Sequence, residues 1–392
     1  MLTAVWVQAK AAWLKLPPSV RWGTSLFLLA RGVLWLWGWA VDTLLPYAPP
    51  TVLPDGPLSP ALEPLLLPWL RHDVLWFTFI AMQGYAVPDG RGAFSPLYPL
   101  LVHWGGLGLG GQYSVAGFLI ANVCCLLSLI VLYEIAEREF QVGRRTLLML
   151  LIYPFAFFLF VPYNESLQLL LTLLVFWGAR SGRWWLAGIG GALAVLTKIT
   201  ALAILPALAV DVWLRRKQQS MWQAAWLVLL PLAALGWIIV RQSVLNAVEV
   251  NLGTAMLSPD FQAGWNEEVV APWVGLISAV LAPFRLWPDS YTAMAVINLL
   301  MMGLVIYWTL LTLRLPHKSW AIYAITMLTI NLMLVVRLVP LLDVPRRMLT
   351  AFPLFVAAAL YWPSRGRRVT VAIALVFQLA LSAFFVKWVL IG

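Results

Sequence analysis

Charged residues are scarce in this chain. Asp, Glu, Lys and Arg together make up 11% of its 392 residues, whereas 62% are hydrophobic and the mean hydropathy is +0.87. Soluble domains average about 25% charged residues, so this composition excludes an ordinary soluble globular protein. The chain instead repeats apolar runs near the roughly twenty residues that cross a bilayer, which predicts a polytopic helical membrane protein.

Cysteine and histidine are also rare. The two cysteines, Cys124 and Cys125, are adjacent within an apolar run, which excludes a disulfide framework. Among the three histidines, His72 alone stands beside an acid, Asp73, and this pair is too small for a zinc or manganese site. The sequence therefore predicts no metal and no cofactor.

Acidic residues are fewer than basic ones, and the formal net charge is +10. The basic residues occur in short clusters between apolar runs, where they indicate cytoplasmic loops rather than a nucleic-acid-binding surface. The run at residues 23–45 is too long for a signal-peptide core and has no small-residue cleavage site after it. We therefore expect a retained first membrane span and no nucleic-acid partner.

The order of apolar runs and charges predicts about eleven crossings in one membrane domain, residues 1–392. We find no internal repeat, low-complexity tract or separate soluble domain in the sequence. Residues 1–20 predict a helix on the cytoplasmic surface, because apolar residues recur there at helical spacing. The predicted crossings are residues 23–45, 115–133, 146–161, 165–179, 222–240, 290–313, 319–336, 350–362 and 369–390, with two more in a hairpin at residues 184–213.

The hairpin follows from the spacing of basic clusters. Residues 180–183 and 215–217 are both basic, hence both cytoplasmic, and only about thirty residues separate them. Two short helices must therefore meet at an apex, which falls at Lys198. An ammonium group at that depth needs a buried partner or an aqueous cavity. Two further segments, residues 46–113 and 241–289, are predicted as external loops because they carry prolines and acids.

The chain concentrates unusual residues at positions 69–101, in the first external loop. A His-Asp pair, a Gly-Tyr turn and several prolines lie there between two hydrophobic segments. A carboxylate so close to lipid requires an explanation, which makes Asp73 the first candidate for a functional residue. The topology places more ionisable residues on the same outer side, near membrane depth: Arg71, His72, Glu165, Lys198, Arg337, Asp343, Arg346 and Arg347.

Acids and cations that converge on one face suit a specific kind of reaction. A carboxylate can act as general base toward a hydroxyl group. Fixed cations can stabilise an anionic phosphate as it departs. The arrangement fits glycosyl transfer from a polyprenyl-phosphate sugar.

Several motifs add to this interpretation. They are Asp73, Ile80-Ala81 with Gly84-Tyr85, AFSPLYP at residues 93–99, Tyr153-Pro154, PYNESL at residues 162–167, residues 180–187, LTKIT at residues 196–200, and more loosely Pro345-Arg346 and FPLF at residues 352–355. In this order and spacing they resemble the signature of PIG-V-type mannosyltransferases, the family that includes GPI mannosyltransferase II and its bacterial relatives. The likeness covers residues 60–210 well and the C-terminal third loosely.

The resemblance implies a GT-C fold in a bacterial plasma membrane, with the site facing away from the cytoplasm. It implies transfer of mannose, with inversion, from a polyprenyl-phosphate donor to an unknown acceptor glycan, lipid or protein. Asp73 matches the family's acid in the first external loop and is our candidate catalytic base. The residues expected to bind donor or substrate are Arg71, His72, Tyr163, Glu165, Lys198, Arg346 and Arg347.

The chain departs from the family pattern at five positions. His72 replaces a tryptophan, Ser95 a phenylalanine and Asn164 a serine or threonine, while Lys198 replaces an arginine and Arg347 an aromatic residue. Lysine keeps the positive charge but lacks the planar fork that grips phosphate twice. A catalytically degenerate GT-C scaffold is therefore an alternative.

Simpler explanations stay open for each residue. Asp73 could cap a helix, Glu165 could begin the next span, and Lys198 could extend to the outer interface. His72 could be a packing residue. The alternative function is a transporter or flippase of a lipid-linked sugar, although such folds often repeat broken helices in both halves and this hairpin has no counterpart.

Overall fold

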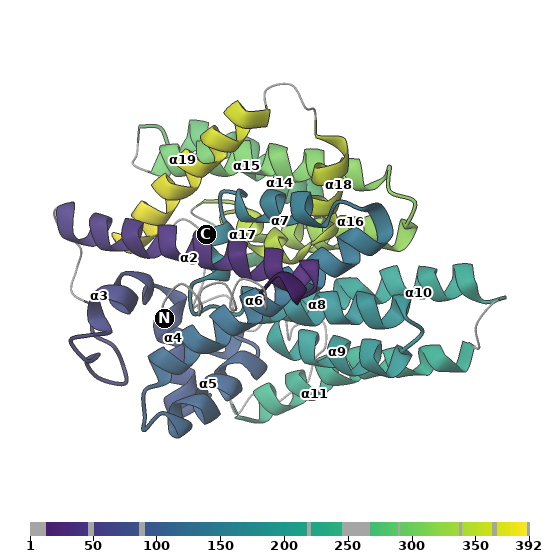
Figure 1. Ribbon diagram of the computed structural model, residues 1–392, viewed down its shortest axis with the longest axis horizontal. Helices are drawn as coiled ribbons and strands as arrows, with labels where there is room; N and C mark the ends of the chain where they lie inside the picture. The colour runs from purple at the N-terminus through teal and green to yellow at the C-terminus, as the bar shows by residue number, and fades with distance from the viewer. Residues whose placement is uncertain are drawn as a thin grey trace.

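The computed structural model describes residues 13–45, 51–85, 91–217, 221–244, 267–288, 291–336, 339–362 and 367–389. These residues form helices and one two-stranded ribbon, so the prediction of a helical membrane protein is confirmed (Figure 1). Most of the surface helix predicted at residues 1–20 lies outside the described residues. Arg337 and residues 245–266 and 289 of the loop predicted at residues 241–289 also lie outside the described residues.

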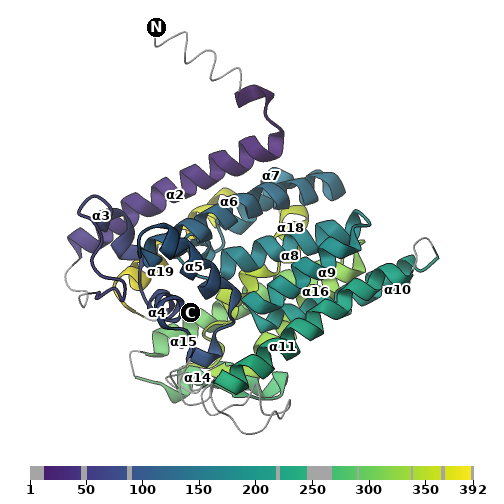
Figure 2. The same cartoon turned by 90° about the horizontal axis from the view of Figure 1, so that it is seen from below.

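Most of the longer helices follow the long axis of the molecule (Figures 1 and 2). In chain order the α-helices are α2 (Pro18–Leu44), α3 (Glu63–Leu66), α4 (Asp73–Gln83), α5 (Leu97–Gly108), α6 (Tyr113–Phe140), α7 (Gly143–Leu151), α8 (Glu165–Arg180), α9 (Trp184–Thr197), α10 (Ile204–Arg215), α11 (Leu229–Val244), α14 (Pro272–Arg285), α15 (Tyr291–Thr312), α16 (Lys318–Met333), α17 (Val344–Arg347), α18 (Pro353–Tyr361) and α19 (Arg367–Val386). The 3₁₀ turns are η1 (Leu67–Trp69), η2 (Arg91–Ala93), η3 (Ala156–Leu159), η4 (Ile199–Ala203), η5 (Met221–Val228) and η6 (Met348–Thr350).

Five helical segments within the described ranges have the length and hydropathy of a membrane span. They are Pro18–Leu44, Tyr113–Phe140, Trp222–Val244, Tyr291–Thr312 and Arg368–Val386. The pair formed by α3–η1 and α4 makes a sixth if it is taken as one bent span. Other predicted crossings correspond to helices shorter than 18 residues, such as α8, α16 and α18.

The crossing predicted at residues 146–161 is not one continuous helix. Helix α7 ends at Leu151, and the separate turn η3 follows it. Pro154 lies between them; proline lacks an amide N–H and disfavours the helical conformation of the residue before it. The chain therefore passes this region as a bent segment, in which Phe155 and Phe158 are fully buried.

The crossing predicted at residues 319–336 also ends differently. Helix α16 stops at Met333, and the strand β2 (Leu334–Val336) pairs antiparallel with β1 (Glu267–Val269). Val335 and Val336 are β-branched and favour an extended backbone. The ribbon therefore ties the end of α16 to the segment that precedes α14.

A sharp break precedes α4. The helical segments on either side of residues 70–72 are bent by 101°. His72 at the break has a φ of 54°, which residues other than glycine rarely adopt. Such strain persists only where the surrounding structure enforces it. The break makes Asp73 the first residue of α4 and leaves its side chain buried.

Lys198 occupies the joint between α9 and η4. Helix α9 ends at Thr197, and Lys198 has an extended backbone with a φ of −159°. Helices α9 and α10 both extend from this joint toward the right of Figure 1. The interval 184–213 therefore contains two short helices with Lys198 between them.

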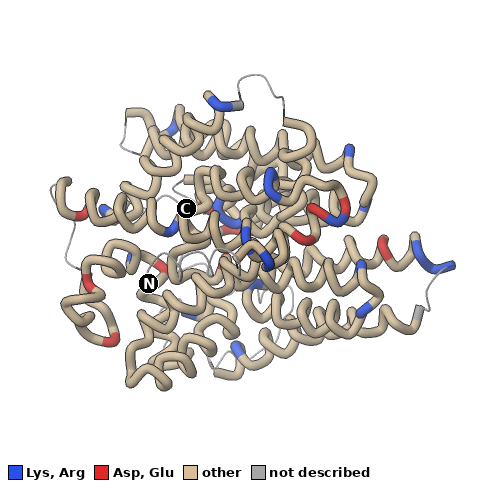
Figure 3. The backbone as a smooth tube through the Cα atoms, viewed as in Figure 1, with Lys and Arg blue, Asp and Glu red and all other residues tan. Residues whose placement is uncertain are grey.

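Helix α8 lies between α6 and α9 and packs against both (Figure 2). Nearly all of its residues are buried. Other helices expose apolar faces: on α2, Leu28, Leu29 and Leu36 are 62%, 64% and 71% exposed. An exposed apolar face on such a long helix suits contact with lipid. Figure 3 shows how few charged residues interrupt these helices and that several gather near the middle of the molecule.

Candidate active site

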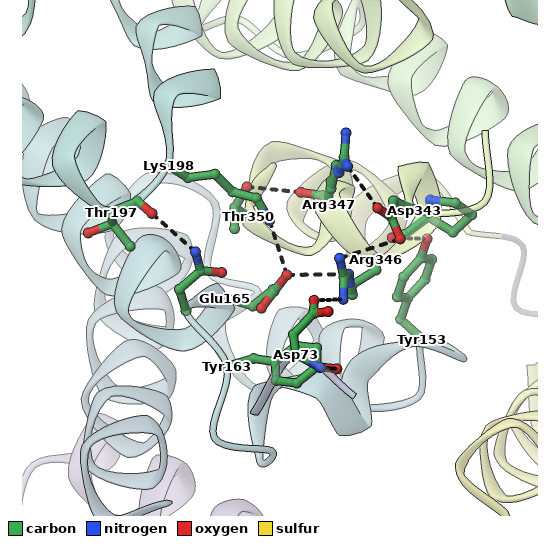
Figure 4. Close-up of polar contacts among 12 residues, drawn as sticks. Asp73, Tyr153, Tyr163, Glu165, Thr197, Lys198, Asp343, Arg346, Arg347 and Thr350 are labelled. Atoms are coloured by element: carbon green, nitrogen blue, oxygen red, sulfur yellow. Dashed lines mark hydrogen bonds and ion pairs between the residues drawn. The ribbon is translucent and has the colours of Figure 1, made fainter. Parts of the chain in front are cut away.

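Charged side chains from distant parts of the chain meet in the interior (Figure 4). They come from the starts of α4 and α8, from the joint between α9 and η4, and from α17 with the residue before it. We call this group the central cluster. Its members are Asp73, Glu165, Lys198, Asp343, Arg346 and Arg347.

Asp73 is held by two contacts. Its Oδ2 accepts a hydrogen bond from Arg346 Nη1 at 2.9 Å. Its backbone N–H donates to the Tyr163 hydroxyl at 3.0 Å. The N-cap residue of α4 is His72 and not Asp73, so the capping explanation does not account for the position of the Asp73 carboxylate. A carboxylate at the start of a helix also gains from the helix dipole.

Arg346 is the centre of the cluster. Besides Asp73, its guanidinium lies 3.5 Å from Glu165 Oε1 and 3.4 Å from Asp343 Oδ1. The rings of Phe158 and Tyr163 each lie with their centroids 5.3 Å from its Cζ. One cation therefore links three carboxylates and rests on two aromatic faces, which favour a desolvated guanidinium.

Lys198 pairs with Glu165 at 3.1 Å between Nζ and Oε1. The neighbouring residues bind each other as well, since the Asn164 side chain donates to the Thr197 carbonyl at 3.1 Å. The start of α8 is thus joined to the end of α9 by two adjacent contacts. Lys198 does not simply extend to the interface, because its ammonium is held by a carboxylate that is 1% exposed.

Arg347 pairs with Asp343 at 2.7 Å between Nη2 and Oδ2. Burial would raise the pKa of Asp343, but Arg346 and Arg347 outweigh it and lower that pKa to about 2. Asp343 is therefore ionised at neutral pH, which makes it a weak proton acceptor and a firm anchor for both arginines. It was not among our predicted binding residues. Its spacing of three and four residues from the two arginines on a short helix is the signal that could have identified it.

Exposure differs within the central cluster. The side chains of Glu165 and Arg346 are 1% and 8% exposed, whereas those of Lys198 and Asp343 are 20% and 19% exposed. Asp73 lies between, at 12%. The cluster thus has a buried core, Glu165 with Arg346, whereas Lys198 and Asp343 are its most exposed members.

Three predicted binding residues are not members of the cluster: Tyr163 contacts it through the backbone of Asp73, whereas Arg71 and His72 lie outside it. Arg71 pairs with Asp42 at 3.4 Å and donates from Nε to the Val386 carbonyl at 3.1 Å. The ring of His72 packs against Phe385 and Trp388, with centroid distances of 5.2 and 5.0 Å. Both side chains therefore join the first external loop to the end of α19.

The described part of the chain also contains an apolar groove of about 200 Å³. Residues of α7, α15 and α19, including Trp308 and Phe377, line it. Tyr153 links the groove to the cluster, because it lines the groove while its hydroxyl donates to the Pro345 carbonyl at 2.8 Å. Within the described ranges, no three His, Cys, Asp or Glu residues form a group that could hold a metal ion.

No protein-family model matches this chain, and no curated protein matches it. Solved structures with partial likeness include ArnT from Cupriavidus metallidurans bound to undecaprenyl phosphate, with 17% identity, a TM-score of 0.48, and coverage of 90% of this chain and 62% of that one. The apo state of the same ArnT is 14% identical, with a TM-score of 0.46 and coverage of 89% of this chain and 62% of that one. The Archaeoglobus fulgidus oligosaccharyltransferase in complex with zinc and sulfate is 16% identical, with a TM-score of 0.40 and coverage of 92% of this chain and 52% of that one. This chain thus spans under two thirds of the length of each.

Proposed function

We propose that this protein is an integral membrane glycosyltransferase of the GT-C type. It transfers a sugar, mannose by its PIG-V-like motifs, from a polyprenyl-phosphate donor to an acceptor hydroxyl on the extracytoplasmic side of a bacterial plasma membrane. The observation that carries the proposal is the contact between Asp73 and Arg346 inside a buried cluster that also holds Lys198 and Arg347. A carboxylate and several cations at one point are what the reaction needs.

Asp73 is the proposed catalytic base. Its Oδ2 is held by Arg346 and its backbone by Tyr163, so the carboxylate has a defined direction. It removes the proton from the acceptor hydroxyl while that oxygen attacks the anomeric carbon from the face opposite the phosphate. The bond between the anomeric carbon and the phosphate oxygen breaks in the same step, which inverts the anomeric configuration and requires no covalent intermediate.

Lys198 and Arg347 are the proposed phosphate ligands. Each is held by its own carboxylate, Glu165 for Lys198 and Asp343 for Arg347, so both cations have defined positions. Cations positioned before the reaction stabilise the leaving phosphate without reorganisation. The apolar groove beside Tyr153 suits a polyprenyl tail, because its lining is almost entirely apolar.

The test is a transfer assay with purified protein in liposomes. Labelled polyprenyl-phosphate mannose is supplied with an acceptor fraction from a bacterial lysate, and GDP-mannose serves as the control donor. We expect label to move to the acceptor from the lipid donor and not from GDP-mannose. Movement of the donor across the bilayer without transfer would instead establish a flippase, and the absence of both activities would favour a scaffold.

A further inference from the structure

Arg31 carries a charge in the interior of a membrane helix. It lies within α2, one of the candidate spans, and is 2% exposed. Among the described residues no carboxylate forms an ion pair with it, and its Nε and Nη2 have no hydrogen-bond partner. A charge in such a place is costly, which makes a functional role the first hypothesis.

The guanidinium of Arg31 occupies an aromatic enclosure. Its Cζ lies 4.5 Å from the ring centroid of Phe118, 4.7 Å from that of Trp35 and 5.8 Å from that of Trp69. Its Nη1 donates to the Phe160 carbonyl at 3.1 Å. Ring faces stabilise the charge here in place of an acid.

Two of these contacts lead to the proposed site. Trp69 lies four residues before Asp73, and Phe160 lies five residues before Glu165. Arg31 therefore contacts the two segments that lead into Asp73 and Glu165, at a residue that precedes each acid in the sequence.

Other residues of α2 reinforce the same two contacts. A Cβ at Gly38 would lie 2.7 Å from the Trp69 ring, so the indole packs directly on the backbone of α2. Phe27 stacks on Phe160 with centroids 5.6 Å apart. The Phe160 carbonyl also accepts a hydrogen bond from Asn122 of α6 at 3.2 Å. Helix α2 thus contacts the segment of Trp69 through Gly38 and the segment of Phe160 through Phe27. Arg31 lies between Phe27 and Gly38 in the sequence of this helix.

We propose that Arg31 is a positioning residue, which sets the separation of Asp73 and Glu165 by holding Trp69 and the Phe160 carbonyl at once. The inference rests on the transferase function proposed above. Reacting groups must be held close to their productive geometry, and a displacement of about 1 Å can cost about 10²-fold in rate.

The test uses Arg31→Met, Arg31→Lys and Gly38→Ala in the full-length protein. Gly38→Ala displaces Trp69 without changing Arg31, so it perturbs the same segment independently. Arg144→Met is the matched control, because the Arg144 guanidinium packs over Trp22 of α2 at 4.1 Å but contacts neither segment. The measurements are donor KM, kcat, thermal stability, and backbone hydrogen–deuterium exchange in the apo protein.

For Arg31→Met we expect kcat to fall by about 10²-fold, with donor KM changed by less than about threefold. Exchange should accelerate at residues 70–76 and 161–168 while that of α9 and α10 stays unchanged. Arg31→Lys should recover part of the loss, since an ammonium can still donate to the Phe160 carbonyl but cannot stack as a planar group. Gly38→Ala should accelerate exchange at residues 70–76. Arg144→Met should change neither kcat nor the exchange at the two segments.

Wild-type exchange at both segments in Arg31→Met would overturn the proposal. So would a uniform increase across all helices, because that pattern marks a general loss of stability. If the wild-type protein transfers no sugar from the lipid donor, the proposed function fails. The exchange experiment still decides whether Arg31 positions the two segments.

Discussion

The central cluster differs from a second ionic group at the ends of helices, which we call the helix-end cluster. The helix-end cluster consists of Glu139, Arg180, Asp211, Arg215 and His317. In it, Glu139 Oε2 lies 2.7 Å from Arg180 Nη2 and 2.9 Å from His317 Nε2. Arg180 and Arg215 are the last residues of α8 and α10, where the helix dipole favours a cation.

The difference lies in where the partners come from. The helix-end contacts join residues near the ends of helices, and Arg180, the most exposed of these side chains, is 25% exposed. Asp73 and Arg346 are 273 residues apart in sequence and meet in the interior under two aromatic rings. Charges at helix ends need little explanation beyond the fold, whereas buried charges are costly and indicate function.

The largest expected effect separates the clusters by activity. Asp73→Asn should lower turnover by roughly 10²- to 10⁴-fold, because the amide cannot accept the acceptor's proton. Donor binding and protein level should stay near those of the wild type. Asp42→Asn is the matched control, since Asp42 also pairs with an arginine, Arg71, but outside the central cluster. Near-normal turnover of Asp73→Asn in the lipid-donor assay would end its assignment as the base.

The next effect separates the clusters by stability. Arg346→Met leaves three carboxylates without their shared partner, so it should lower the free energy of unfolding by about 3–5 kcal/mol. Arg180→Met removes a partly exposed pair and should cost at most about 1 kcal/mol. Denaturation of both variants in the same detergent measures the difference. Equal losses would mean that the central cluster is no more critical to stability than the helix ends.

A third effect concerns phosphate. Lys198→Met should weaken binding of polyprenyl phosphate and slow transfer, by up to about 10²-fold, because it removes a donor to the leaving group. Lys198→Arg should retain most activity, since guanidinium also binds phosphate. Lys318→Met, in an exposed lysine outside both clusters, is the control. Unchanged transfer and lipid competition in Lys198→Met would contradict the assignment.

The smallest expected effect depends on pH and belongs to the helix-end cluster. Burial and the nearby Arg180 lower the pKa of His317, and Glu139 only partly opposes them. Because the folded pKa is below the ordinary value of about 6.5, the stability contributed by neutral His317 is complete above that pH and is lost as pH falls through the lowered value. His317→Gln should therefore flatten the fall in melting temperature at acidic pH. An identical profile in the variant would show that other groups cause it.

Much of the candidate site could be predicted because its residues occur in local motifs. Asp73, Glu165 and Lys198 each stand beside a helix end, in a short polar segment that interrupts apolar runs. Arg71 and His72 belong to the same motif as Asp73, yet the break at residues 70–72 directs them to α19 instead. Sequence proximity alone could not separate them, because a single left-handed residue determines which side chain faces inward.

Arg31 shows the opposite case. A lone arginine in an apolar helix has no motif around it, and its partners, Trp69 and Phe160, are distant in sequence. The local pattern indicates only Trp35, one helical turn away, and not the rings of Trp69 and Phe118. Asp343 could have been identified, since its partners are three and four residues away.

By itself the sequence determined that this is a helical membrane protein and where its longest apolar helices lie, because the preference of side chains for lipid or water is a local property. The tertiary structure decided which charges meet. The contact of Asp73 with Arg346 depends on the break before α4, and that of Lys198 with Glu165 depends on the joint after α9. These ion pairs depend on how segments that are distant in sequence pack together. Hydrophobic periodicity along the chain does not specify that packing.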